Sequence, residues 1–82
     1  MSRERELSSL LPGESGRVCS LLCSGGVRRR MLDIGLIKNT EVVCVGESPL
    51  GDPRAYMIRG KVIAIRREDA KTVLLELITN QR

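Results

Sequence analysis

The chain contains no histidine, and this absence limits the chemistry that its side chains can perform. Histidine is the most frequent general base and metal ligand, so neither a Ser–His–Asp nor a Cys–His arrangement can be built within one copy. The carboxylate pairs Glu68–Asp69 and Glu4 with Glu6 lie in charged segments, where such groups normally stay hydrated. Gly25–Gly26 lacks both the Lys–Ser/Thr of a phosphate-binding loop and the third glycine of a dinucleotide-binding loop. The sequence therefore predicts a protein that is not an enzyme.

The three cysteines, Cys19, Cys23 and Cys44, are the remaining residues whose type suits a metal ion. On an extended strand, Cys19 and Cys23 point the same way but lie about 13 Å apart at ~3.3 Å per residue, too far to share one ion. We expect no cofactor and interpret the cysteines as small buried hydrophobic residues or free thiols. The alternative is a weak Fe²⁺ or Zn²⁺ site that these thiolates form transiently or between molecules.

Length, charge and cysteine usage narrow the class of protein further. With 82 residues the chain forms one small domain, and its odd number of cysteines without an export signal favours the cytoplasm. No stretch approaches the ~20 apolar residues that cross a bilayer, so we expect no direct membrane insertion. The net charge is +4 and Tyr56 is the only aromatic residue, whereas single-strand binders stack bases on several aromatic rings. We therefore expect that the protein does not bind nucleic acid, and we keep a nucleic-acid-binding barrel only as an alternative.

The run Arg28-Arg29-Arg30 stands at the beginning of an expected helix, where the helix dipole disfavours each cation by ~0.3 to 1 kcal/mol. An ion pair between Arg29 and Asp33, four residues apart, offsets part of this cost. The presence of three arginines here has two interpretations: they form a solvated face, or they form a docking surface for an acidic partner.

Leu32 lies about 100° from the apolar face of that helix. Either the segment Leu36–Ile37 folds back over Leu32, which we favour, or Leu32 is an exposed anchor ringed by Arg28 and Arg29.

The elements that must position these residues follow from periodicity and from turn residues. Val27, Met31 and Ile34 share one face of a helix over residues 27–34, which Gly35 ends. Runs rich in β-branched residues predict strands over 17–23, 40–45, 55–59, 62–65 and 72–78, with a tight hairpin at Gly60–Lys61. Residues 66–71 are expected to form one helical turn, and the prolines within residues 48–53 exclude regular structure there.

These elements predict a mainly β fold, a small SH3-like barrel of about five strands with one short helix inserted after the first strand. An OB-like barrel has the same number of strands and is the alternative. We expect a polar lead-in over residues 1–9, the barrel domain over residues 10–78 and a frayed tail over residues 79–82.

Several of these segments together resemble one known family. They are Arg28–Leu36, Thr40–Val42, the loop Pro49-Leu50-Gly51-Asp52-Pro53, Ile58–Gly60 and Ala64–Ala70, followed by a final apolar strand. In this order they resemble the ferrous iron transport protein A (FeoA) family, and the likeness extends from Leu10 to Leu77.

The resemblance implies an SH3-like barrel in the cytoplasm that assists a FeoB-type membrane permease, whose G-domain region would be the partner. It also implies a regulator of ferrous iron uptake that is not itself the transporter. Small barrels act by presenting loops, so we expect partner contacts from Arg28, Arg29 and Leu32 on the helix and from Pro49, Leu50, Gly51, Asp52 and Pro53 in the loop. Weak self-association is a further expectation.

Overall fold

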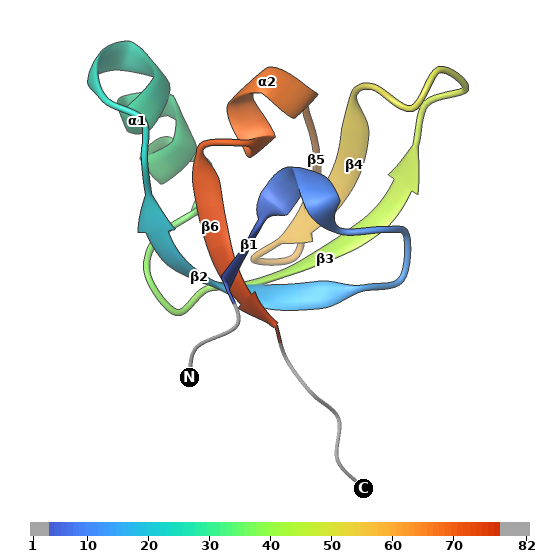
Figure 1. Cartoon of the computed structure of the whole chain (residues 1–82), viewed down its shortest axis with the longest axis horizontal. Helices are drawn as coiled ribbons and strands as arrows, with labels where there is room; N and C mark the ends of the chain where they lie inside the picture. The colour runs from blue at the N-terminus through green and yellow to red at the C-terminus, as the bar shows by residue number, and fades with distance from the viewer. Residues whose placement is uncertain (1–3, 78–82) are drawn as a thin grey trace, which may run out of the picture.

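The computed structural model describes residues 4–77, and six strands, two α-helices and one 3₁₀ turn are found within them. In chain order these elements are β1 (Glu4–Glu6), η1 (Leu7–Ser9), β2 (Ser15–Leu21), α1 (Gly25–Asp33), β3 (Glu41–Glu47), β4 (Arg54–Ile58), β5 (Lys61–Ile65), α2 (Arg67–Ala70) and β6 (Val73–Leu77). The expectation of a mainly β fold with a short helix between early strands is confirmed (Figure 1).

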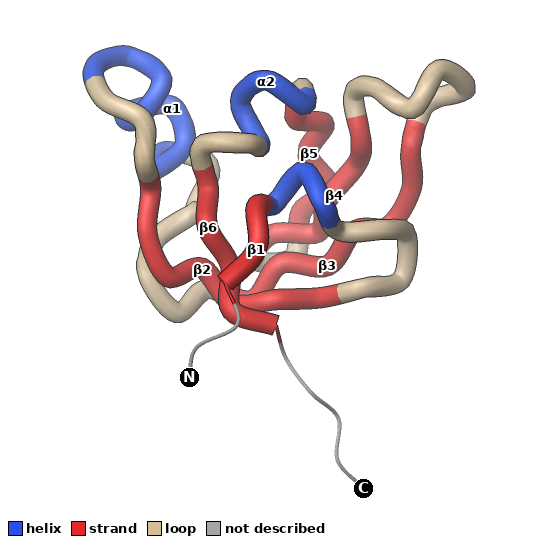
Figure 2. Tube along the Cα trace, viewed as in Figure 1, coloured by secondary structure: helices blue, strands red, loops and turns tan. Residues whose placement is uncertain are grey.

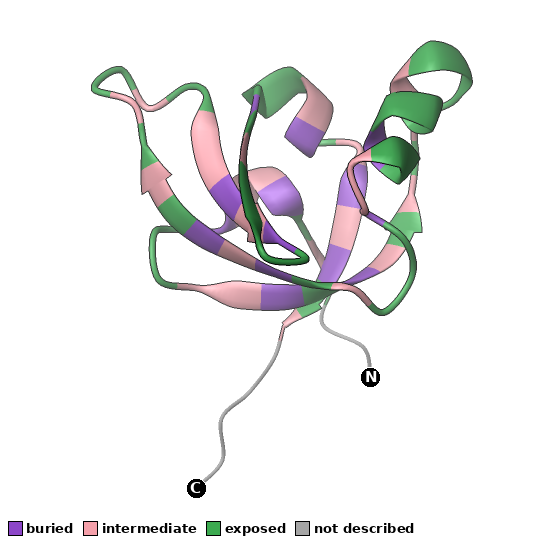
Figure 3. Cartoon of the chain, turned by 180° about the vertical axis from the view of Figure 1, so that it is seen from behind, coloured by how far each residue is buried: buried purple, intermediate pink, exposed green. Residues whose placement is uncertain are grey.

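All six strands form one antiparallel sheet in the order β1-β6-β2-β3-β4-β5. The sheet curls around a single core, as the path of the strands in Figure 2 shows. Figure 1 places α1, α2 and the loop between β3 and β4 along one end of this curled sheet, and the view from behind in Figure 3 agrees. The predicted partner residues therefore come from elements at the same end of the molecule.

The core consists of aliphatic side chains together with Cys44 and Tyr56, and no polar or charged side chain of residues 4–77 is buried among them. Alternation along the strands decides which side chains enter it: Val42 and Cys44 of β3 are buried, as are Tyr56 and Ile58 of β4. Burying one aliphatic side chain of this size stabilises the fold by ~1.5 to 3 kcal/mol, so this layer holds the curled sheet together.

The expected polar lead-in is structured where the structure describes it. Residues 4–6 form β1, which pairs with β6 from Glu4 opposite Glu76 to Glu6 opposite Leu74. Leu7, in η1, is completely buried, because the 3₁₀ turn directs it into the core. Residues 4–9 are therefore part of the sheet and core, and the number of strands rises from about five to six.

The other expected elements have the right type, with boundaries that shift by a few residues. The helix begins at Gly25 rather than at residue 27, the first expected strand ends at Leu21 rather than at residue 23, and the last described strand residue is Leu77. Ile78 and the expected tail over residues 79–82 lie outside the described residues.

The hairpin between β4 and β5 is a tight turn, as expected, but it lies one residue earlier than the expected Gly60–Lys61. Ile58 stands opposite Lys61, so Arg59 and Gly60 are its two central residues. Their φ angles are +52° and +85°, as the type I′ turn requires, and glycine adopts this conformation without a steric cost.

Candidate functional site

Helix α1 ends in a Schellman motif, which fixes the chain that follows it. The backbone N–H of Gly35 donates to the carbonyl oxygen of Leu32, and that of Leu36 donates to Met31, both at 3.0 Å. Gly35 has a φ of +105°, and a Cβ at this position would lie 2.7 Å from Cδ of Arg59. A side chain at position 35 would therefore be strained by the backbone conformation, and it would require the side chain of Arg59 to shift. The motif turns Leu36 into the core, where it is completely buried.

This arrangement settles the orientation of Leu32. The expected fold-back is wrong, because Leu36 enters the core beneath the helix and does not cover Leu32. Leu32 keeps 38% of its surface exposed and lines a shallow depression of about 370 Å³ with Arg28, Arg29 and Asp33. Three of the predicted partner residues thus meet on the outer face of α1.

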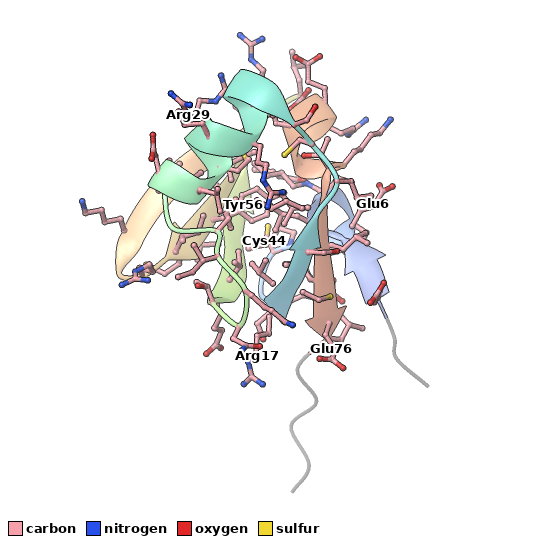
Figure 4. All side chains as sticks on the ribbon, turned by 90° about the vertical axis from the view of Figure 1, so that its left-hand side faces the viewer. Glu6, Arg17, Arg29, Cys44, Tyr56 and Glu76 are labelled. Carbon is pink, nitrogen blue, oxygen red and sulfur yellow. The ribbon has the colours of Figure 1, made fainter. Side chains whose placement is uncertain are left out.

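The three consecutive arginines have different surroundings. Arg30 forms an ion pair with Asp69 of α2, with Nη2 to Oδ2 at 2.7 Å, whereas the expected pair of Arg29 with Asp33 is not among the ion pairs of residues 4–77. Arg28 donates through Nη1 to the carbonyl oxygen of Leu21 at 3.4 Å. Arg29 points away from the barrel (Figure 4). Only Arg30 crosses to another helix, so Arg28 and Arg29 remain beside Leu32.

The loop between β3 and β4 carries the other predicted partner residues. Leu50 is 91% exposed, and Pro49 and Pro53 are exposed on either side of it. The loop is closed by two backbone hydrogen bonds, from Gly51 N–H to Ser48 at 2.8 Å and from Ser48 N–H to Pro53 at 3.1 Å. Leu50 is therefore the free apolar tip of a constrained turn.

Asp52 has an internal role that the sequence did not indicate. Its Oδ1 accepts the backbone N–H of Arg67 at 2.8 Å, at the first residue of α2. An acceptor at this position satisfies an N–H group that the helix leaves unpaired. Asp52 thus ties the loop to α2, and it is less available to a partner than Leu50.

A second hollow, the α1–β5 groove, lies between the helix and strand β5. Its volume is about 560 Å³, and its walls include Val27, Met31 and Ile34 of α1 and Ile63 of β5. The Arg30–Asp69 ion pair lies in its lining as well. The sequence alone does not reveal this groove, because its two walls are separated by about thirty residues. The helical face at Val27, Met31 and Ile34 is the one signal of it that the sequence carries.

The three cysteines lie in separate parts of the fold. Cys44 is buried in β3, Cys23 follows the end of β2, and Cys19 lies at a bulge where the pairing of β2 with β6 shifts between Val18 and Ser20. Because of this bulge and the early end of β2, the assumption of one straight strand from Cys19 to Cys23 is wrong. Within residues 4–77, no group of three or more Cys, Asp or Glu side chains is placed to hold a metal ion.

The environment of Cys19 also keeps its sulfur neutral. Burial raises the pKa of the Cys19 thiol, and the carboxylates of Glu4 and Glu76 raise it further. Metal ligation and nucleophilic attack both require the thiolate. The surroundings of Cys19 therefore disfavour its thiolate form.

A cluster of hydrogen bonds surrounds Arg54 and Tyr56, and no local pattern in the sequence indicates it. Arg54 donates through Nη1 to the carbonyl oxygens of Ser8, at 3.0 Å, and of Leu10, and the Tyr56 hydroxyl donates to that of Leu7 at 3.4 Å. Burial raises the pKa of Tyr56 to about 12, and Figure 4 shows this side chain inside the barrel beside Cys44. The cluster anchors the N-terminal segment and leaves no open cavity for a substrate.

No helix within residues 4–77 combines the length and the apolar character that crossing a membrane demands. One end of the barrel carries three candidate surfaces: the depression around Leu32, the α1–β5 groove, and the tip of the loop between β3 and β4. Figure 1 shows α1 and this loop on opposite sides of that end, with α2 between them.

Comparisons with known proteins agree with this architecture. Residues 5–77 match the family model described as the FeoA domain. A Porphyromonas gingivalis protein, described as an Fe(2+) transport protein A/Fe(2+) transporter FeoB fusion protein, is 32% identical over 74 residues, or 90% of this chain. The match covers 9% of that protein, so this chain spans less than a tenth of its length.

Two solved structures are similar over most of their length. An NMR structure of a FeoA-like protein from Clostridium acetobutylicum has a TM-score of 0.88 and 28% identity, with coverage of 100% of this chain and 95% of that one. The crystal structure of Stenotrophomonas maltophilia FeoA complexed with zinc, described as an SH3 domain protein, has a TM-score of 0.77 and 28% identity, with coverage of 87% and 88%. The expected SH3-like barrel is thereby confirmed.

Proposed function

The chain belongs to the FeoA family, and we propose that it is a non-enzymatic, cytoplasmic accessory of ferrous iron uptake that docks on a FeoB-type membrane permease. The observation that carries this proposal is the P. gingivalis relative, which is described as a fusion of the two proteins in one chain. Linking two modules raises their effective concentration toward each other, so a fusion favours modules that act together.

We place the docking surface on α1 and the loop between β3 and β4. Leu32 is a partly exposed apolar residue beside two cations, Arg28 and Arg29, and this combination suits a partner surface with an apolar pocket and an acidic rim. Leu50 adds a second exposed apolar residue at the same end of the barrel. The flanking residues Pro49 and Pro53 restrict the free loop, which lowers the entropy lost on binding.

Docking in this proposal requires no resident metal. The S. maltophilia relative was crystallised with zinc, but the three cysteines of this chain lie in separate elements and Cys19 is held as a thiol. The ferrous ion is the cargo of the permease rather than a cofactor of this protein.

The test is a binding measurement between the full chain and the purified cytoplasmic domain of the permease from the same organism. The double variant Leu32→Glu with Leu50→Glu should bind at least ten-fold more weakly, because it replaces both exposed apolar contacts with charges that an acidic surface repels. Leu11→Glu is the matched control, since Leu11 is 54% exposed in a different part of the chain and should change the affinity less than two-fold. Equal affinities for the double variant and the wild type would reject the proposed surface, and absence of binding by the wild type would reject the function.

A further inference from the structure

The sheet has two edges, and they differ in how well they are protected against additional strands. β1, at one edge, has three residues, Glu4, Arg5 and Glu6, all of them charged. Short length and charge are devices by which proteins prevent an edge from pairing with another chain. The edge at β1 is therefore protected.

β5, at the other edge, lacks these devices. It has five residues, Lys61-Val62-Ile63-Ala64-Ile65, and its register with β4 runs without a bulge. It contains no proline and a single charge, at its first position. It pairs only with β4, and no other backbone group within residues 4–77 hydrogen-bonds to it.

The hairpin register shows which residues of β5 present their backbone groups to the free edge. In a two-residue hairpin, the residues that flank the turn exchange hydrogen bonds, so Lys61 bonds to Ile58 and the pattern alternates along the strand. Ile63 and Ile65 therefore also bond to β4, whereas the N–H and C=O groups of Val62 and Ala64 face outward. Both residues are exposed, so their backbone groups are open to an additional strand.

The α1–β5 groove runs beside this edge. Its volume of about 560 Å³ lies within the range of about 300 to 1,000 Å³ that binding clefts commonly have. Val27 and Ile34 of α1 and Ile63 of β5 are half-buried in its lining. A strand added at β5 would place alternate side chains against this apolar wall, which is the geometry of strand-addition sites.

The charges around the edge indicate what kind of strand fits. Arg59 and Lys61 stand at one end of β5 and form no ion pair within residues 4–77. Arg66 follows the other end, where it forms a long, exposed ion pair with Glu68 at 4.0 Å. Of the acidic groove residues, Asp69 is already paired with Arg30 at 2.7 Å. A second copy of this chain would bring Lys61 of each copy close to Arg66 of the other in antiparallel pairing, which like charges oppose. An acidic segment meets three cations along this edge and one exposed groove carboxylate, that of Glu68, which Arg66 already pairs at 4.0 Å.

We propose that the free edge of β5 binds an extended, acidic segment of the partner protein as an additional strand, with apolar side chains of that segment entering the α1–β5 groove. This inference rests on the proposed function, because it specifies how the permease domain is held. Backbone hydrogen bonds to Val62 and Ala64 supply the attachment, and Arg59, Lys61 and Arg66 select for carboxylates.

Ala64→Pro in the full chain tests the proposal. Proline at this position removes an outward-facing N–H while leaving the hydrogen bonds between β4 and β5 intact, as edge strands tolerate. The affinity for the permease's cytoplasmic domain should fall at least ten-fold, whereas Ala64→Val, which keeps the N–H, should stay within two-fold. Lys61→Glu should weaken binding several-fold and reduce its salt dependence.

Hydrogen exchange of the wild-type complex gives a readout that does not depend on the folding of a variant. The amide of Ala64 should exchange at least ten-fold more slowly in the complex than in the free chain. If the domain binds while the Ala64→Pro variant binds equally well and the Ala64 amide is unprotected, the inference falls and the proposed function stands. If the wild type does not bind the domain, both fall. Dimerisation of the chain alone, with protection at Ala64, would identify a second copy as the occupant and overturn the acidic segment.

Discussion

The segment from Leu7 to Leu10 and helix α1 are both short and lie outside the strands, yet they are held by different contacts. Leu7 and Leu10 are completely buried, and side chains of β4 donate hydrogen bonds to three carbonyl oxygens of this segment. In α1, by contrast, Met31 alone is buried, and one ion pair joins the helix to α2. The N-terminal segment is therefore part of the core, while most side chains of α1 face the solvent.

The substitution Leu10→Ala tests most directly whether the two regions contribute differently to stability. Removing a completely buried leucine leaves a cavity and should lower the free energy of unfolding by ~2 to 5 kcal/mol. Leu32→Ala, on the outer face of α1, should change it by less than ~0.5 kcal/mol. Urea denaturation of the two variants measures the difference, and similar losses would show that the two regions are held alike.

The pH dependence of stability tests how well the contacts of the N-terminal segment bury Tyr56. Burial raises the pKa of Tyr56 from 10.0 to about 12, so the folded chain keeps the hydroxyl neutral at a pH where the unfolded chain ionises it. The contribution to stability is complete below pH 10 and decreases as the pH rises from 10 to 12, by a total of ~3 kcal/mol.

Tyr56→Phe is the control for this effect, because it removes the titrating group and retains the ring. Denaturant unfolding at pH 8 and at pH 11.5 should show a larger loss of stability in the wild type than in the variant. Identical losses would mean that Tyr56 does not hold its proton through burial.

The loop between β3 and β4 is intermediate between the two regions, since one side-chain hydrogen bond from Asp52 ties it to α2. Asp52→Ala should lower the free energy of unfolding by ~0.5 to 2 kcal/mol, the usual cost of losing a helix cap. Asp52→Asn keeps an oxygen acceptor and should lower the free energy of unfolding by only a few tenths of a kcal/mol. Thermal melts compare the two, and equal losses would contradict a capping role.

The sequence predicted the strands and the helix well wherever local patterns decide the structure. The face formed by Val27, Met31 and Ile34, the glycine at position 35 and the tight turn at Gly60 are all local signals, and each leads to the observed element. The strand at residues 4–6 was missed because its partner, β6, lies about seventy residues later. Three alternating charged residues carry no β-strand signal of their own.

The surfaces were harder to predict than the elements. Leu32 was expected under Leu36–Ile37, but the Schellman motif at Gly35 sends Leu36 inward, where it is completely buried. The role of Asp52 as a cap and the pairing of Arg30 with Asp69 likewise join residues that are fifteen or more positions apart. Composition and local spacing do not predict contacts between residues so far apart in the sequence.

The pairing of β1 with β6 has a consequence for how this domain can be built into larger proteins. Glu4 stands opposite Glu76, so the chain enters and leaves the barrel at neighbouring points, and Figure 1 shows these points at the end away from α1, α2 and the loop. Adjacent entry and exit allow a domain to be inserted as a cassette without stretching either connection. A neighbouring module attached at either point would lie opposite α1, α2 and the loop, so the elements of the proposed docking surface would stay uncovered.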